Sequence, residues 1–226
     1  MSTTEPRLRR GVFITIEGLD GCGKTTQLER LAARLRDRGF DVEQTVEPGG
    51  TRIGGEIRRI LLDARNQEIV PVTELLLYFA SRAQNVAEKI RPGLEAGKIV
   101  LSDRYTDSTL VYQGMARGLG EQVVRQLHEI ACGGLDPDLT LYLDIDPEAG
   151  LARARNRNRN AQGAAAGQTR MDEQSAEFYR RVREGYRELA RREPRRVRLI
   201  DAARSIEEVE RDVWATVSAF LEKLHV

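Results

Sequence analysis

The sequence predicts an α/β fold in which helices cover both faces of a parallel sheet. Short apolar segments of strand length alternate along the chain with longer stretches of helical periodicity. A glycine-rich loop joins the first predicted strand to the first predicted helix. No repeat and no clear linker divides the 226 residues, a length that suits one domain. We therefore expect a single domain over residues 1–226.

Five segments are predicted as strands. The first, Val12–Ile16, is almost entirely apolar or β-branched and ends close to Gly18. Such near-continuous runs are typical of strands buried on both faces of a parallel sheet. The five predicted strands span residues 12–16, 41–46, 99–101, 140–143 and 197–200.

Helical patterns fill most of the intervening chain. In the first of them Leu28, Leu31 and Leu35 recur at helical spacing, and Gly39 ends the helix. The predicted helices span residues 24–38, 53–64, 72–90, 108–112, 121–131, 147–159, 173–192 and a last segment that Ser205 caps. Residues 160–169 are rich in Ala, Gly and Gln and predict a loop. We interpret residues 153–172 as a lid.

The charge balance excludes several classes of partner. The formal net charge is +1, so no overall field favours nucleic acid or an anionic membrane. The apolar runs are too short for a membrane span, and no signal peptide is expected. The two cysteines, Cys22 and Cys132, match no zinc or disulfide spacing and predict free thiols in the cytoplasm.

The glycine-rich loop matches G-x-x-x-x-G-K-[ST], a P-loop, and it lies between a strand and a helix as that motif requires. Backbone N–H groups of such a loop bind phosphates, and glycines permit the curled backbone. Lys24 is expected to reach the outer phosphates of ATP, and the Thr25 hydroxyl to bind Mg²⁺. The predicted ATP-binding residues are Gly18, Leu19, Asp20, Gly21, Cys22, Gly23, Lys24 and Thr25.

Three further features narrow the reaction. Asp103 ends a buried strand, where its carboxylate could hold Mg²⁺ directly or through water. The guanine-reading motif Asn-Lys-x-Asp is absent, which argues against a GTPase. Arginines crowd the chain near Arg82, Arg104 and 153–170, as a kinase for an already phosphorylated substrate would need.

The lid arginines alternate along the end of a predicted helix. Arg153 and Arg157 share one helical face, and Arg155 and Arg159 share another. Like charges so close together favour a bound anion, which a lid closing over the triphosphate would supply.

Jointly, several motifs resemble those of bacterial thymidylate kinases over most of the chain. They are Glu17-Gly18-Leu19-Asp20-Gly21-Cys22-Gly23-Lys24-Thr25-Thr26, Glu47-Pro48-Gly49-Gly50-Thr51, Phe79-Ala80-Ser81-Arg82, Asp103-Arg104-Tyr105, and Ser108-Thr109 with Tyr112-Gln113-Gly114. The resemblance implies a three-layer P-loop kinase fold with a five-stranded parallel sheet and an arginine-rich lid. It also implies transfer of a phosphoryl group from ATP to dTMP with Mg²⁺, and a homodimer.

The resemblance also assigns roles by position. Phe79 would stack on thymine, Arg82 would pair with the polar edge of the base, and Arg104 would hold the dTMP phosphate. Asp20 would lie near the sugar hydroxyl and the phosphate-binding arginines. The remaining residues expected around the base and sugar are Thr109, Tyr112 and Gln113.

The P-loop itself carries no basic residue between Leu19 and Cys22, so this chain resembles the class that supplies a catalytic arginine from the lid. The lid candidates are Arg153 and Arg170. The other predicted catalytic residues are Lys24, Arg104 and Asp20. Arg170 resembles the arginine of the family's lid motif Asp-Arg-x-Glu, although Thr169 and Asp172 replace its acids.

Some residues have simpler interpretations. Tyr105 is expected to pack structurally and His128 to lie at the surface or in packing. Cys22 is expected to be a small filler of the P-loop, and the helix terminus beside it could lower the pKa of its thiol. Two alternative functions remain open: a kinase for another nucleotide or for deoxynucleosides, and a P-loop module that binds nucleotide without transferring phosphate.

Overall fold

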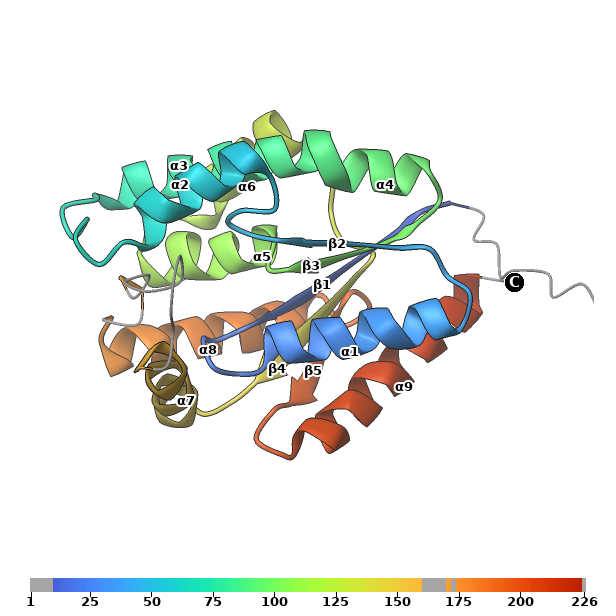
Figure 1. Cartoon of the computed structure of the whole chain (residues 1–226). Coiled ribbons are helices and arrows are strands. Elements are labelled where there is room, and N and C mark those ends of the chain that lie inside the picture. The colour runs from blue at the N-terminus through green and yellow to red at the C-terminus, as the bar shows by residue number, and fades with distance from the viewer. Residues whose placement is uncertain (1–9, 160–169, 172–173, 225–226) are drawn as a thin grey trace, which may run out of the picture.

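A wholly parallel, five-stranded sheet forms the centre of the molecule in the order β2-β3-β1-β4-β5. The computed structural model describes residues 10–159, 170–171 and 174–224. The strands are β1 (Val12–Gly18), β2 (Val42–Val46), β3 (Ile99–Asp103), β4 (Leu139–Asp144) and β5 (Val197–Asp201). The predicted α/β fold and all five predicted strands are confirmed (Figure 1).

The three central strands explain why the sequence shows unbroken apolar runs. Every residue of β1, β3 and β4 is buried, because helices cover both faces of the sheet. The polar side chains among them are satisfied internally: the Thr15 and Thr140 hydroxyls, on adjacent strands, lie 2.9 Å apart and share a hydrogen bond. The outer strands β2 and β5 each have two buried and three more exposed positions.

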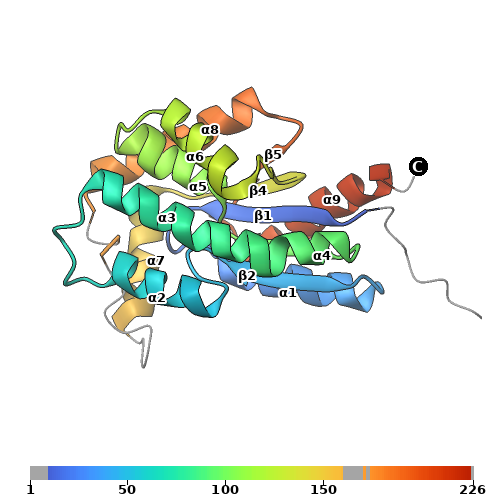
Figure 2. The ribbon, with the colours of Figure 1, turned by 90° about the horizontal axis from the view of Figure 1, so that it is seen from above.

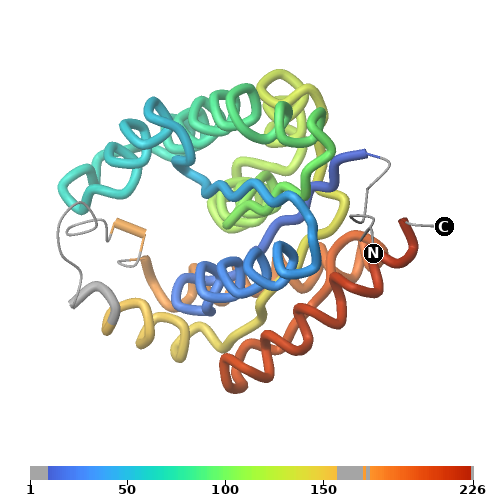
Figure 3. The backbone as a smooth tube through the Cα atoms, turned by 45° about the vertical axis from the view of Figure 1, so that its right-hand side comes forward, coloured from blue at the N-terminus to red at the C-terminus, as the bar shows by residue number. Residues whose placement is uncertain are grey.

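Helices pack on both faces of this sheet. Figure 1 shows α1 and α9 on one side and α3, α4 and α6 on the other, and Figure 3 shows α9 running alongside α1. The helices are α1 (Lys24–Asp37), α2 (Arg52–Leu62), α3 (Pro71–Asn85), α4 (Arg91–Glu95), α5 (Thr106–Thr109), α6 (Glu121–Cys132), α7 (Pro147–Arg159), α8 (Ala176–Arg192) and α9 (Ile206–Leu224). Two π-helical segments, η1 (Val86–Ile90) and η2 (Leu110–Ala116), continue α3 and α5. The predicted helix over 72–90 is therefore an α-helix that widens in its last turn.

Local signals fix several helix ends. Gly23, with φ of 97°, precedes α1, and Gly39, with φ of 84°, follows its end. Ser205 Oγ accepts a hydrogen bond from the Glu208 N–H at 3.3 Å and donates to the Glu208 carboxylate at 2.7 Å. This reciprocal pair confirms the predicted cap of the last helix.

Parallel strands bring their carboxyl ends to one edge of the sheet, and the P-loop leaves β1 there. Figure 2 shows α2 and α7 gathered at this end. Asp103 of β3 lies in register with Ile16 of β1 and Val46 of β2. The edge is therefore the expected place for a ligand in an open α/β sheet.

Part of the predicted lid lies outside the described residues: the loop 160–169 with Thr169, the position of Asp172, and the side chains of Arg157 and Arg159. Within the described ranges, no helix has the length and apolar composition that a membrane crossing requires.

Candidate active site

The P-loop has the backbone that phosphate binding needs. Gly18, Gly21 and Gly23 all have positive φ, at 144°, 78° and 97°. A Cβ atom at Gly18 would lie 2.6 Å from the Leu143 carbonyl oxygen, so a larger residue would displace the loop. No side chain caps the start of α1. The loop thus leaves the helix N-terminus open to an anion.

Lys24 lies folded against this loop. Its side chain is largely buried, and its Nζ donates hydrogen bonds to the carbonyl oxygens of Leu19 at 2.9 Å and Gly18 at 3.3 Å. These are weak neutral acceptors for an ammonium group, and phosphate oxygens would be stronger ones. The position of Lys24 therefore suits an outer phosphate held on the loop.

Thr25 and Asp103, the two predicted metal ligands, come together. The Thr25 hydroxyl donates to Asp103 Oδ2 at 2.8 Å across the gap between α1 and β3. Hydroxyl and carboxylate oxygens are the ligands that Mg²⁺ prefers. No group of three or more His, Cys, Asp or Glu residues within the described ranges could hold a metal by itself. A metal at this place would thus depend on phosphate oxygens as further ligands.

A cavity opens beside the P-loop, between the strand ends and helices α2, α3 and η2. Its walls are formed by Asp20, Glu47, Pro48, Arg58, Leu62, Tyr78, Arg82, Arg104, Ser108, Thr109, Tyr112, Gln113 and Met171. Five of the six predicted substrate residues line it, namely Arg82, Arg104, Thr109, Tyr112 and Gln113. The sequence motifs that contribute them are thus brought to one place by the fold.

Arg104 lies at the P-loop end of the cavity. Its Nη2 donates to Asp20 Oδ1 at 2.8 Å and its Nη1 to Ser108 Oγ at 3.1 Å. Among the described residues it is the one non-glycine with positive φ, at 72°. Such a backbone costs on the order of 1–2 kcal/mol and persists only where surrounding contacts enforce it. The guanidinium is thus held beside the predicted phosphate site.

Arg82 also lines the cavity and is 1% exposed. Its Nε donates to Glu47 Oε2 at 2.6 Å, and its Nη2 donates to the Thr109 hydroxyl at 2.9 Å and the Tyr105 carbonyl at 3.1 Å. Its Nη1 has no hydrogen-bond partner in the described part of the chain. A buried donor without a partner is costly, so this atom fits a ligand acceptor in the cavity.

The aromatic wall differs from the prediction. Phe79 is 3% exposed and belongs to the hydrophobic core, where the Arg82 guanidinium stacks on its ring with 4.9 Å between the guanidinium carbon and the ring centre. Tyr78, its neighbour, lines the cavity instead. Burial raises the pKa of Tyr78 to about 12, so its hydroxyl stays protonated. The structure therefore places the side chain of Tyr78, and not that of Phe79, in the wall of the cavity.

Arg170 also differs from the prediction of a lid residue facing the transferred phosphate. It is 3% exposed, and its Nη2 donates to Glu74 Oε2 at 2.7 Å. Its Nε donates to the Leu61 carbonyl at 2.5 Å, at the end of α2. Glu74 Oε1 also accepts from Gln113 Nε2 at 2.8 Å. Arg170 thus ties its own segment of the chain to α2 and α3, and it does not line the cavity.

Arg153 lies on the opposite side of the P-loop. It is exposed, and its Nη1 donates to the Ala202 carbonyl at 3.4 Å. A second cavity opens here, lined by Gly21, Cys22, Gly23, Thr26, Gln27, Arg153, Ala202, Arg204, Ser205, Ile206 and Val209. The P-loop therefore separates two cavities, with Arg104 in one and Arg153 in the other.

Comparison with known proteins agrees with this geometry. The family model for thymidylate kinase matches residues 16–213. The thymidylate kinase of Nitratidesulfovibrio vulgaris is 51% identical over 210 residues, which cover 93% of each chain. This chain belongs to the thymidylate kinase family. The thymidylate kinase of Syntrophotalea carbinolica is 52% identical over 91% of this chain and 94% of its own. The crystal structure of thymidylate kinase from Ehrlichia chaffeensis matches with a TM-score of 0.71 and 32% identity, over 92% of this chain and 98% of that chain.

Sequence reasoning missed two groups of residues in this family member. Arg58 of α2 lines the first cavity beside Arg104, and its Nη1 donates to the Pro48 carbonyl at 2.8 Å. The segment from Ala202 to Ile206 lines the second cavity. Arg58 is one of several arginines on a predicted helix, and no spacing distinguishes it.

Three smaller expectations can also be compared with the structure. Tyr105 is fully buried and packs its edge on Phe13, with ring centres 4.8 Å apart, so its packing role is confirmed. His128 is buried and packs against Tyr105, with ring centres 6.0 Å apart. Cys22 is buried, as a small filler would be, but the expected lowering of its thiol pKa is wrong, because burial raises that pKa despite the helix terminus.

Proposed function

We propose that this protein transfers the terminal phosphoryl group of ATP to dTMP, giving ADP and dTDP. The observation that carries the proposal is that two chemically different groups of side chains line the first cavity. We place a monophosphate at the P-loop end, beside Arg58 and Arg104. We place the base at the other end, beside Arg82 and Gln113. A nucleoside monophosphate fits this order of groups.

The base end favours thymine over cytosine. Arg82 Nη1 is a donor in need of an acceptor, and O4 of thymine is an acceptor. Gln113 Nε2 already donates to Glu74, so the Gln113 amide oxygen is oriented to accept the N3–H of thymine. At these positions cytosine has an amino group, which is a donor and would face the donor Arg82 Nη1. Its unprotonated N3 is an acceptor and would face the acceptor oxygen of Gln113.

The donor would lie on the P-loop, with its phosphates on the loop N–H groups and Lys24. We propose that the second cavity takes the nucleoside part of ATP, because it adjoins Gly21, Gly23 and Arg153. Thr25 and Asp103 would hold Mg²⁺. When bound, Mg²⁺ supplies charge neutralisation to the phosphate oxygens.

The chain's own residues then act by positioning and by electrostatics. Arg104, oriented by Asp20 and Ser108, would hold the dTMP phosphate in line with the triphosphate. Arg153 is the lid arginine on the donor side, and we propose that it stabilises charge on the transferred group. Arg170, paired with Glu74, would keep the lid attached to the acceptor side.

We also propose a homodimer and a cytoplasmic location. Four large apolar side chains on adjacent helices are well exposed: Val72 at 55% and Leu76 at 51% on α3, and Val123 at 43% and Ile130 at 81% on α6. A second copy of this chain would cover such a face. Both cysteines are free thiols in the structure, as a reducing compartment favours.

A coupled assay of ADP release with dTMP, dUMP, dCMP, dGMP and thymidine tests the function. We expect the highest kcat/KM for dTMP, and a value about ten- to a hundredfold lower for dCMP, because each opposed buried donor costs about 1–3 kcal/mol. Thymidine should be a poor substrate, since it lacks the anion for Arg58 and Arg104. Preference for another monophosphate would assign a different kinase. No ADP release with any substrate would support a non-catalytic nucleotide-binding module.

A further inference from the structure

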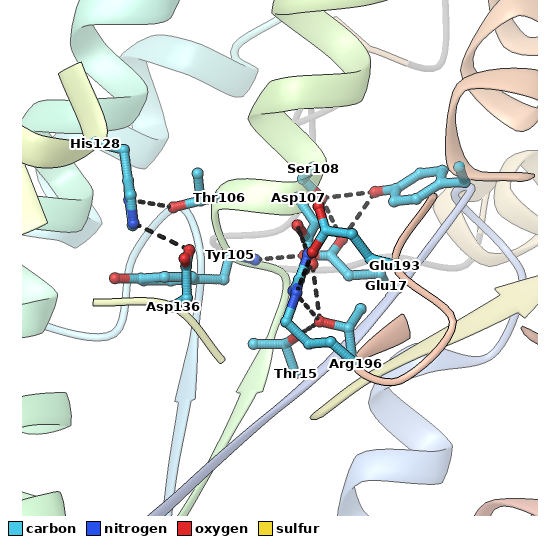
Figure 4. Close-up of polar contacts among 12 residues, drawn as sticks. Thr15, Glu17, Tyr105, Thr106, Asp107, Ser108, His128, Asp136, Glu193 and Arg196 are labelled. Carbon is cyan, nitrogen blue, oxygen red and sulfur yellow. Dashed lines mark hydrogen bonds and ion pairs between the residues drawn. The ribbon is translucent and has the colours of Figure 1, made fainter. Parts of the chain in front are cut away.

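Glu17 is a fully buried carboxylate immediately before the P-loop, and it lines neither cavity. Its Oε1 accepts a hydrogen bond from the Tyr105 N–H at 2.7 Å. Its Oε2 accepts from the Ser108 hydroxyl at 2.5 Å and from the Tyr186 hydroxyl at 2.8 Å. Figure 4 shows these contacts joining β1 to the segment that follows β3 and to α8.

We propose that Glu17 is a positioning residue that fixes Arg104 relative to the P-loop, and that its negative charge is needed for this role. The inference rests on the proposed function, in which Arg104 holds the dTMP phosphate. Glu17 would not touch either substrate.

The first link between Glu17 and Arg104 runs through the backbone. The N–H that donates to Glu17 belongs to the peptide unit joining Arg104 to Tyr105. That peptide unit leaves the strained backbone of Arg104, with φ of 72°. A hydrogen bond to a charged acceptor contributes about 1.5–3 kcal/mol, enough to offset the cost of this conformation.

The second link runs through the side chains. Arg104 Nη1 donates to the Ser108 hydroxyl at 3.1 Å, and that hydroxyl donates to Glu17. While Glu17 is ionised, the hydroxyl hydrogen of Ser108 points to the carboxylate. The lone pairs of the hydroxyl oxygen then remain to accept the hydrogen bond from Arg104. A protonated Glu17 would itself donate to one of these hydroxyls and would no longer attract the guanidinium.

The surroundings place this change of charge near neutral pH. Burial, followed by the Asp107 carboxylate, raises the pKa of Glu17 to about 7, and the Arg104 guanidinium and the hydroxyls of Ser108 and Tyr186 oppose the rise. Asp107 belongs to α5 and Tyr186 to α8, so groups from both packed elements contribute. Asp107 is itself paired with Arg196, at 2.7 Å between carboxylate oxygen and Nη1 (Figure 4).

The test compares kcat/KM for dTMP from pH 5.5 to 9, with ATP saturating, in wild type and Glu17→Gln. Loss of one charge-assisted contact should lower kcat/KM for dTMP about tenfold at pH 8, mainly through KM. The KM for ATP should stay unchanged. In the wild type, kcat/KM for dTMP should decrease at pH values below the Glu17 pKa of about 7. The variant should lack this inflection and keep only the ionisation of the dTMP phosphate at a pKa of about 6.

Two further variants should move the inflection in opposite directions. Asp107→Asn removes a negative neighbour, so it should lower the Glu17 pKa and leave the high-pH plateau unchanged. Tyr186→Phe removes a donor to the carboxylate, so it should raise that pKa. If Glu17 is needed only for folding, both variants should have lower thermal stability and neither should shift the inflection of the pH profile.

The outcomes separate the two proposals. If the wild type turns over dTMP and Glu17→Gln has the same pH profile and the same KM for dTMP as the wild type, the positioning role alone would be overturned. If Glu17→Gln yields no folded protein, unshifted inflections in both Asp107→Asn and Tyr186→Phe would overturn it equally. A wild type without activity on dTMP would instead overturn the proposed function.

Discussion

Replacing Glu17 by glutamine should remove a specific component of the pH dependence of folding stability. The pKa of Glu17 rises from 4.5 to about 7, first because of burial. Between these two values the unfolded chain releases a proton that the folded protein keeps. The free energy of unfolding of the wild type should therefore fall as pH rises through this window, and should level off above pH 7.

The magnitude follows from the two pKa values. A difference of about 2.5 pKa units corresponds to about 3.4 kcal/mol when fully expressed. From the linkage relation, about 0.8 kcal/mol of this penalty is present at pH 5 and about 3.3 kcal/mol at pH 8. Glutamine has no proton to release. Relative to wild type, Glu17→Gln should thus gain about 2.5 kcal/mol of stability between pH 5 and pH 8.

Urea unfolding at both pH values measures this gain through the fluorescence of Trp214, the single tryptophan of the chain. Any effect of the glutamine side chain on the free energy of unfolding that does not depend on pH cancels when the two pH values are compared. Glu177→Gln on the exposed face of α8 serves as the control, because its ion pair with Arg181 lies at the surface and contributes little. A difference between Glu17→Gln and wild type that is equal at pH 5 and pH 8, or larger at pH 5, would refute the reasoning.

Five other substitutions test the placement of single residues. Tyr78→Ala should raise the KM for dTMP about tenfold or more through loss of stacking, whereas Phe79→Leu should mainly lower the melting temperature; the reverse pattern in steady-state kinetics would restore Phe79 as the stacking residue. Arg153→Ala should lower kcat by about a hundredfold with little change in KM for dTMP, and a change confined to KM would make it a binding residue. Arg170→Ala should destabilise the protein by about 3–5 kcal/mol in urea unfolding, because it leaves Glu74 with one fewer cation, and a loss of kcat at unchanged stability would make it catalytic after all. Ile130→Glu should convert the proposed dimer to monomer in light scattering, and an unchanged mass would place the interface elsewhere.

The features that sequence predicted well are those with a local physical cause. The strand Val12–Ile16 is apolar because both faces of the sheet are covered, and this can be read without knowing its neighbours. The P-loop places Lys24 and Thr25 by the geometry of one turn. The cap formed by Ser205 and Glu208 needs only a spacing of three residues.

The features that sequence did not predict depend on distant partners or on helix rotation. Tyr78 and Phe79 lie four and three residues before Arg82, and both spacings put a side chain on the arginine's helical face. Which of the two lines the cavity is decided by how α3 packs, and that is not a local property. Arg170 pairs with Glu74 across 96 residues of sequence. Its motif predicted a charged residue in the lid but could not identify this partner.

Buried glutamates pair with arginines throughout the site, and the pairs differ in a way that bears on substrate orientation. At the base end, Arg82 is neutralised by Glu47, with a closest distance of 2.6 Å. Glu74, which lies behind this end, pairs with two arginines, Arg170 at 2.7 Å and Arg117 at 3.3 Å. The pair of Arg82 and Glu47 fixes the direction of a hydrogen bond without presenting net charge, which suits an uncharged base.

The P-loop end of the cavity has a different balance of positive and negative charge. There Arg58 and Arg104 line the wall with one carboxylate, that of Asp20. Since Glu47 is already paired with Arg82, positive charge exceeds negative charge at this end, where a phosphate dianion would restore the balance. A nucleoside monophosphate entering in the reverse direction would bring its phosphate to the neutral pair of Arg82 and Glu47 and its base to the cations. Charge alone therefore favours the orientation in which the acceptor phosphate lies next to the phosphates of ATP.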